Sequence, residues 1–142
     1  MNLTLETART IIDQALATGA EHGFKPLTVV VLDAGGHVTA AARQDGASNN
    51  RFEIAQGKAY GALALGMGSR AIMERAEQQA YFIAAATAAL GGRLIPVPGG
   101  VLVRDNDGTV VGAVGISGDS SDNDETAATT AIEAAGLTAQ AA

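Results

Sequence analysis

The chain has 142 residues, of which 47% are hydrophobic, and this combination suits one compact domain with its own core. Its formal net charge of −6 disfavours nucleic acid and anionic membranes as partners, because both require basic patches that nine scattered Lys and Arg residues do not form. The lack of cysteine excludes disulfides, thiolate metal sites and cysteine nucleophiles. With no leader-like or membrane-spanning segment in the sequence, we expect a cytoplasmic protein.

The amino-terminal part predicts one amphipathic helix followed by a β-hairpin. Thr4 is placed to cap the helix, and apolar residues recur at helical spacing until Gly23. A continuous apolar run at 27–32 and a return strand at 37–43 flank a glycine-rich turn. We therefore expect two paired antiparallel strands after the first helix.

Three helices are expected in the middle of the chain. Asn50, with a glutamate three positions later, predicts a capped helix that ends near Gly66. Ser69 is placed to cap a shorter helix over 70–80, and a more apolar helix is predicted over 82–90.

The carboxy-terminal part predicts a second hairpin and a last helix. An extended segment containing two prolines precedes strands at 101–104 and 109–116, which are joined by an Asn-Asp-Gly turn. The last helix is expected over about 124–135. Hairpins require antiparallel pairing, so we predict an α+β fold with helices on both faces of the sheet.

The segment 110–125 is the most informative part of the sequence. Its apolar strand runs directly into Ser117 and a cluster of acidic residues, and small residues within the strand leave room for another backbone or a ligand. Ser121 or Asp122 is placed to cap the following helix, with Asp124 in its first turn. This pattern is typical of a well-capped helix, and it also suits a polar site at a strand end.

Four sequence blocks, in this order, resemble the GlcG/HbpS-like haem-binding family, which includes the carboxy-terminal domain of PduO. The blocks are LDAGGHVTAAARQDGASN, GKAYGALALG, PVPGGVLVRDNDGTVVGAVGISG and SDNDE. The resemblance covers nearly the whole chain, and it implies a single domain over 1–142 with a profilin-like, three-layer α-β-α sandwich. It further implies a five-stranded antiparallel sheet, whose fifth strand would be 94–97, and assembly as a homo-oligomer.

The resemblance implies haem as the first candidate ligand, held through an axial histidine or a hydroxyl group. The sequence has two histidines, His22 and His37, and His22 lies in the region where relatives place an axial histidine. Either imidazole can instead be solvated or bonded to the backbone.

Glu74 and Glu77 match a Glu-x-x-Glu pattern that some relatives use for a surface iron site. Carboxylates three positions apart lie on one helix face and can share a hard cation. The simpler interpretation is a solvated helix flank that pairs with Arg70 or Arg75.

A second hypothesis, from the polar residues, is the binding or conversion of a small organic acid. Arginine and lysine side chains could hold its carboxylate, and a nearby aspartate could act as acid or base if its pKa is shifted. The candidate acids are Asp119, Asp122 and Asp124. The candidate ligand-binding residues are Arg43, Asp45, Asn49, Lys58, Arg70, Tyr81 and Ser117.

Alternatives remain open for these residues. The charges could form surface salt bridges, although Lys58 lies among Ala, Gly and Leu and needs a partner there. Tyr81 is either a core anchor or the wall of a pocket. Whether the protein is an enzyme stays open, and a structural or regulatory oligomer without a ligand is a third possibility.

Overall fold

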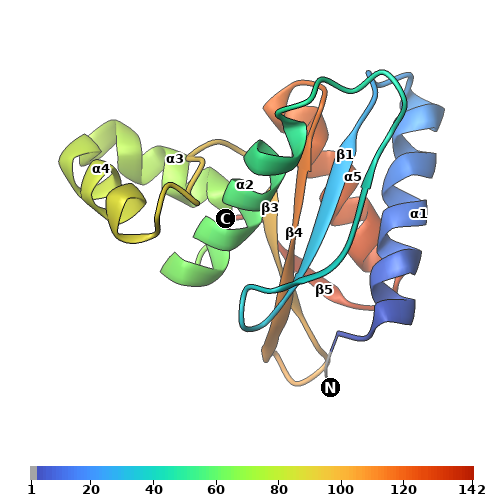
Figure 1. The fold of residues 1–142 in the computed structure, drawn as a ribbon. Coiled ribbons are helices and arrows are strands. Elements are labelled where there is room, and N and C mark those ends of the chain that lie inside the picture. Colours follow the sequence, from blue (N-terminus) through green and yellow to red (C-terminus); the bar gives the residue numbers. More distant parts are fainter. Residues whose placement is uncertain (1–2) are drawn as a thin grey trace.

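A computed structural model describes residues 3–142 of the chain. Its strands form one antiparallel sheet in the order β2-β1-β4-β3-β5 (Figure 1). The elements, in chain order, are α1 (Leu5–His22), β1 (Thr28–Asp33), β2 (Val38–Arg43), α2 (Arg51–Leu65), α3 (Ser69–Gln78), α4 (Ala80–Ala89), β3 (Gly100–Arg104), β4 (Val110–Ser117), α5 (Ser121–Ala134) and β5 (Thr138–Gln140).

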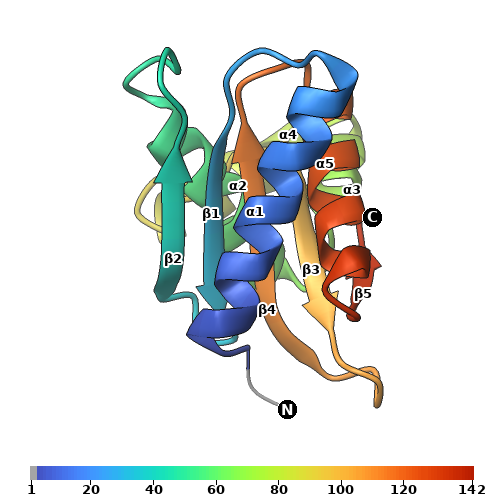
Figure 2. The ribbon, with the colours of Figure 1, turned by 90° about the vertical axis from the view of Figure 1, so that its right-hand side faces the viewer.

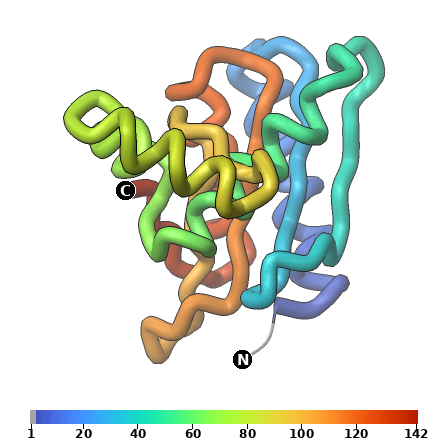
Figure 3. The backbone as a smooth tube through the Cα atoms, turned by 60° about the vertical axis from the view of Figure 1, so that its left-hand side comes forward, coloured from blue at the N-terminus to red at the C-terminus, as the bar shows by residue number. Residues whose placement is uncertain are grey.

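Helices cover both faces of the sheet. Helices α1 and α5 lie side by side on one face, and α2 lies on the other (Figure 2). The α3 and α4 helices extend from the α2 side as an arm, and Ile72, Ile83 and Leu94 form the small core of that arm (Figure 3). The expected three-layer α-β-α sandwich with a five-stranded antiparallel sheet is thus confirmed.

The alternation of side chains along the strands supplies two separate cores. Val29 and Val31 face the larger core under α1 and α5, whereas Val30 and Leu32 face α2. All four are fully buried. The sequence of β1 is a continuous apolar run because helices cover the strand on both faces.

The predicted fifth strand at 94–97 is wrong. That segment is a loop over α2, where the backbone N–H of Ile95 donates to the carbonyl of Gly57 at 3.3 Å. Pro96 lacks an N–H and disfavours regular pairing. The fifth strand is instead β5, which follows the last helix and pairs with β3.

Of the predicted helix caps, only the first is confirmed. Thr4 accepts the N–H three residues on at 3.1 Å, whereas Asn50 makes no side-chain cap bond. Ser69 lies inside α3 and accepts the N–H of Gly100 at 2.7 Å, which ties the arm to β3. Helix α5 is capped by Ser120, so it begins earlier than expected and neither Ser121 nor Asp122 is the cap.

Glycines let α2 lie unusually close to the sheet. A Cβ on Gly115 of β4 would overlap the carbonyl oxygen of Ala55, and one on Gly100 of β3 would overlap that of Lys58. Because both obstacles are helix backbone, they cannot rotate away. The small residues noted in the β4 sequence therefore admit the α2 backbone, and the close approach places Lys58 beside the sheet.

Candidate functional site

Polar side chains gather at one end of the sheet. It is the end where α2 and α5 begin, at the top of Figure 1. Arg51 donates from Nη1 to the hydroxyl of Ser117 at 3.0 Å and from Nε to the hydroxyl of Ser48 at 3.0 Å. Thr28 lies opposite Ser117 in the sheet and is buried. Within residues 3–142 its hydroxyl has no hydrogen-bond partner.

Lys58 links the two helical layers across this end of the sheet. Its Nζ donates to the carboxylate of Asp124 at 3.2 Å and to the carbonyl of Ile116 at 2.9 Å. Both charged side chains are only 2% exposed. The path of the lysine depends on Gly99, where a Cβ would lie 2.8 Å from Nζ. Asp124 is thus the partner that the sequence predicted Lys58 to need.

Burial has the largest effect on the pKa of both Lys58 and Asp124. Loss of hydration lowers the pKa of Lys58, and the charge of Asp124 opposes that shift. Loss of hydration likewise raises the pKa of Asp124, and it is opposed first by the charge of Lys58 and then by the N–H of Asp119 at 2.9 Å. Asp124 also lies in the first turn of α5, where the helix dipole favours a carboxylate.

Arg70 binds the other acidic side chains at the start of α5. Its Nε donates to Glu125 at 3.0 Å, and its Nη2 donates to Asp122. The arm is thereby held to α5, although Asp122 itself is 78% exposed. The candidate cations Lys58 and Arg70 therefore bind candidate acids of the same chain.

Asp119 closes the corner between β4 and α5. Its carboxylate accepts the backbone N–H of Lys25 at 2.7 Å, the side-chain amide of Asn123 at 2.7 Å and the N–H of Ser120 at 2.8 Å. These bonds, with the Lys25 bond first, hold the pKa of Asp119 below its ordinary value of 3.8. Asp119 thus ties the α1 to β1 loop to the start of α5.

We expect Asp119→Asn to lower the melting temperature at pH 7 by about 2–4 °C, because a neutral acceptor binds these donors less strongly. The folded-state pKa lies below 3.8, so the carboxylate stabilises the fold above that pH and its contribution is lost as pH falls through the folded value. Thermal melts from pH 7 to pH 2 should show the two curves converging at acid pH. Asp45→Asn, a change at an exposed carboxylate with no hydrogen bond in residues 3–142, serves as the control.

Two cavities flank the polar end. A cavity of about 490 Å³ lies between the end of α1 and the end of β2, and its wall contains Gly19, Phe24, Pro26, Arg43 and Asp45. A smaller one, of about 200 Å³, is lined by Lys25, Pro26, Gly46, Ala47, Ser48, Arg51 and Gly118. Arg43 and Asp45 thus share a cavity, whereas Asn49 is exposed on the connecting loop and Lys58 is buried elsewhere.

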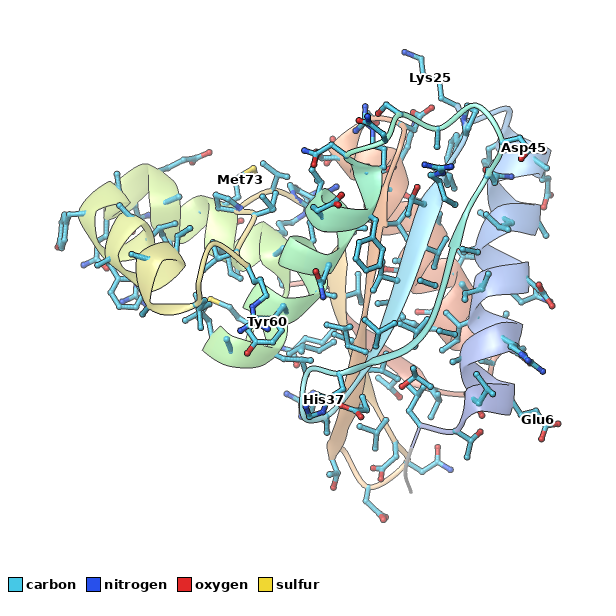
Figure 4. The ribbon with its side chains drawn as sticks, in the orientation of Figure 1. Glu6, Lys25, His37, Asp45, Tyr60 and Met73 are labelled. Carbon is cyan, nitrogen blue, oxygen red and sulfur yellow. The ribbon has the colours of Figure 1, made fainter. Side chains whose placement is uncertain are left out.

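The two histidines lie at opposite ends of the molecule. His22 ends α1 and is exposed, and its Nδ1 is 2.9 Å from the carbonyl of Thr18. Its ring contacts Phe24, which lines the larger cavity, at 5.3 Å between centroids. His37 lies at the other end, away from Asp45 (Figure 4). It is 84% exposed, its Nδ1 is 3.5 Å from Asp33, and it lines a cavity of about 350 Å³.

Glu74 and Glu77 are exposed on α3. The pairing expected for them is wrong, because Arg70 binds acids of α5 and Arg75 donates to Gln79 at 2.7 Å. Within residues 3–142, no three His, Asp or Glu side chains gather closely enough to hold a metal ion. Tyr81 is 73% exposed on α4, which excludes the core-anchor alternative, and its role as a ligand-binding residue stays a prediction.

Three further residues, for which the sequence predicted no functional role, shape this end of the molecule. Gln44 accepts the N–H of Leu27 at 2.7 Å and so holds the β2 end against β1. Thr28 places a buried hydroxyl beside Ser117, and Phe24 joins the His22 ring to the cavity wall. The one available signal was the polar Thr28 at the start of the apolar β1 run. The bond of Gln44 joins residues 17 positions apart, and the place of Phe24 in the cavity wall depends on β2, so neither is visible in the local sequence.

The fold and this polar end define a profilin-like α-β-α sandwich with open cavities at both ends of its sheet. The chain belongs to the HbpS-like family, described as haem-degrading proteins, whose model matches residues 3–133. Among curated proteins nothing matches the chain.

Solved structures agree with this assignment. The crystal structure of a PduOC–haem complex superposes with a TM-score of 0.86 at 26% identity, covering 96% of this chain and 97% of that chain. Klebsiella pneumoniae protein ORFY gives 0.84 at 26% identity, with 94% and 90% covered. A double mutant of Streptomyces reticuli HbpS gives 0.80 at 25% identity, with 94% and 87% covered. Separately, no helix in residues 3–142 is long and apolar enough to cross a membrane.

Proposed function

We propose that the protein binds haem in the cavity between the end of α1 and the end of β2. The observation that carries this proposal is the orientation of His22. Its Nδ1 lies 2.9 Å from the carbonyl of Thr18, and an N–H donated to that oxygen leaves the lone pair on Nε2 free. Metal-binding imidazoles are commonly oriented by this kind of bond, which fixes both ring and tautomer.

The cavity beside His22 suits a large, partly apolar and anionic ligand. Its volume of about 490 Å³ falls in the range of small-molecule sites. Phe24 and Pro26 supply apolar surface, and Arg43 supplies a positive charge for a propionate. Arg43 has no ion pair within residues 3–142, so its charge is available to a ligand.

Phe24 and Arg43, which line the cavity, and His22, whose ring contacts Phe24, would therefore hold the group. When bound, haem would supply redox and oxygen chemistry through its iron, while the protein would supply an imidazole ligand and limit the access of water. The similarity to the PduOC–haem complex and the match to a haem-degrading family support this ligand.

His37 is a second, less favoured candidate for the haem-binding histidine. It lines a cavity of its own, but within residues 3–142 the lining of that cavity contains Asp33, 3.5 Å from its Nδ1, and no Lys or Arg to bind a propionate. In the cavity of the first proposal, Arg43 accompanies the carboxylate of Asp45. The two histidines therefore form a matched pair of test sites.

Titration of apo-protein with haemin should give a saturable, shifted Soret band. His22→Ala is expected to weaken binding by about tenfold or more and to change the band, because the axial ligand is lost. Arg43→Gln should weaken binding less and leave the band position unchanged, because it removes only a propionate contact.

His37→Ala is the control and should change the dissociation constant by less than about twofold. Circular dichroism would verify that each variant is folded. Equal binding by the His22→Ala variant and the unaltered protein, or an additive spectrum without saturation, would contradict the proposal.

The protein is further proposed to assemble as a homo-oligomer, as the family resemblance implies. The organic-acid hypothesis gains no support from the geometry of the polar end. Lys58 and Arg70 are engaged by Asp124, Asp122 and Glu125, and Asp119 is engaged by backbone N–H groups. Glu74 and Glu77 stay a candidate iron site on α3.

A further inference from the structure

The sheet has one protected edge and one open edge. Strand β5 forms the first edge and has three residues, and the backbone after it packs tightly against Gly68. Strand β2 forms the second edge and has six residues, paired on one side with β1. The outer side of such a strand presents unpaired N–H and C=O groups, which can pair with another strand.

Strand β2 lacks most of the features that protect natural edges. Proline and lysine are absent from residues 38–43, and the middle of the strand is three alanines. A register shift near Thr39 bends the start of the strand, so 40–43 is its regular part. Small side chains at 40–42 let another strand approach without a clash.

An open groove runs beside this edge on the α1 face. A cavity of about 490 Å³ is lined by Leu5, Arg9, Ile12 and Asp13 of α1 and by residues 39–42. Of the three large hydrophobic side chains exposed in residues 3–142, two flank this edge. They are Leu5, 47% exposed, and Val38, 46% exposed. The edge therefore combines free backbone groups with exposed apolar surface.

The charges on the groove wall are self-complementary. Arg9 and Asp13 stand one turn apart on α1, and both are exposed. Neither forms an ion pair within residues 3–142. Under a two-fold rotation, opposite charges one turn apart can face each other, giving two equivalent pairs across an isologous interface.

We propose that β2 is the interface for a second copy of this chain. The two β2 strands pair antiparallel about a two-fold axis near Ala41, which joins the two sheets into one. Neighbouring strands lie about 4.8 Å apart, and α1 packs over both β1 and β2, so the two α1 axes lie about 10 Å apart. This is the spacing of packed helices, and it places Arg9 opposite Asp13 of the partner subunit.

This inference specifies the surface of the proposed homo-oligomer and does not depend on haem. A charge-exchange series tests it by sedimentation equilibrium. Arg9→Asp and Asp13→Arg, made singly, each place like charges across the axis and should weaken association by about tenfold or more. The double variant restores two opposite pairs and should recover at least half of the lost association free energy. Glu133→Arg, an equal charge change at an exposed position on α5, should have no effect.

Variants of Ala41 test the strand pairing itself. Ala41→Lys adds a charge at an exposed edge position, so it should leave the fold intact and reduce the oligomer mass at least twofold. The natural chain has no cysteine, so Ala41→Cys can form a disulfide only with its symmetry mate. Mild oxidation should give a covalent dimer, whereas Asn106→Cys, in the β3 to β4 turn, should give little.

The outcomes distinguish the proposal of a homo-oligomer from the proposal that β2 is its interface. A mass near the 14.2 kDa of one chain at all concentrations would overturn both the homo-oligomer and the β2 interface. An oligomer that survives both single charge variants and Ala41→Lys, without a disulfide at Ala41→Cys, would overturn the β2 interface alone. Loss of association in the single variants, with recovery in the double variant, supports both.

Discussion

Asp124→Ala is expected to lower the free energy of unfolding by about 3–5 kcal/mol, because it leaves the buried charge of Lys58 without its partner. Lys58 Nζ is 3.2 Å from the Asp124 carboxylate, and both side chains are 2% exposed, so water cannot replace the lost contact. The change also removes the acceptor for the N–H of Asp119. Urea unfolding followed by circular dichroism measures the loss.

The double variant Lys58→Met with Asp124→Asn shows how much of this loss comes from the unpaired charge of Lys58. It removes both charges while keeping similar volumes and an acceptor for Asp119, so it should be less destabilised than Asp124→Ala. Asp122→Ala is the matched surface control, since that acid is 78% exposed and should cost about 1 kcal/mol or less. Equal stability of Asp124→Ala and Asp122→Ala would show that the buried pair contributes little.

Gly115→Ala is expected to cost about 3 kcal/mol or more, or to prevent folding, because the new methyl group would overlap the backbone carbonyl of Ala55. Helix α2 would have to move away from the sheet, and Lys58 would move with it. The loss should appear in urea unfolding as a lower midpoint.

Gly23→Ala is the control for this substitution. Gly23 has a φ of 69° with nothing within 4 Å of an added Cβ, so alanine there meets only the backbone penalty of about 1–2 kcal/mol. A loss at Gly115→Ala no greater than at Gly23→Ala would mean that α2 can shift easily. In that case the glycines of β3 and β4 would not determine its position.

The predictions for Asp124→Ala and Gly115→Ala both test how α2 is held between the sheet and α5. The glycines of the central strands admit α2, α2 carries Lys58 to the end of the sheet, and Lys58 holds the start of α5 on the opposite face. Lys58, Arg70 and Asp119 at this end of the molecule are therefore bound by groups of the same chain. The proposed haem cavity lies beside this end, and within residues 3–142 neither His22 nor Arg43 forms an ion pair.

Local features of the sequence determined the hairpins and the first helix. The turn at 106–108 and the glycine turn after Asp33 require backbone conformations that few other residues allow, and the apolar runs beside them form strands over nearly the expected ranges. The cap at Thr4 also acts within one helical turn. Such features depend on neighbours in the chain, so the sequence alone is enough to predict them.

Contacts between distant segments were decided only by the tertiary structure. The sequence indicated that Lys58 needed a partner, but nothing local distinguished Asp124 from the other acids of α5. The short β5 strand was missed because three residues carry little periodicity, and it exists because the edge of β3 is available to pair. Ser69 likewise does not cap α3 and instead accepts the N–H of Gly100. Each outcome depends on which groups burial brings together, because a buried polar group must find a partner wherever in the sequence that partner lies.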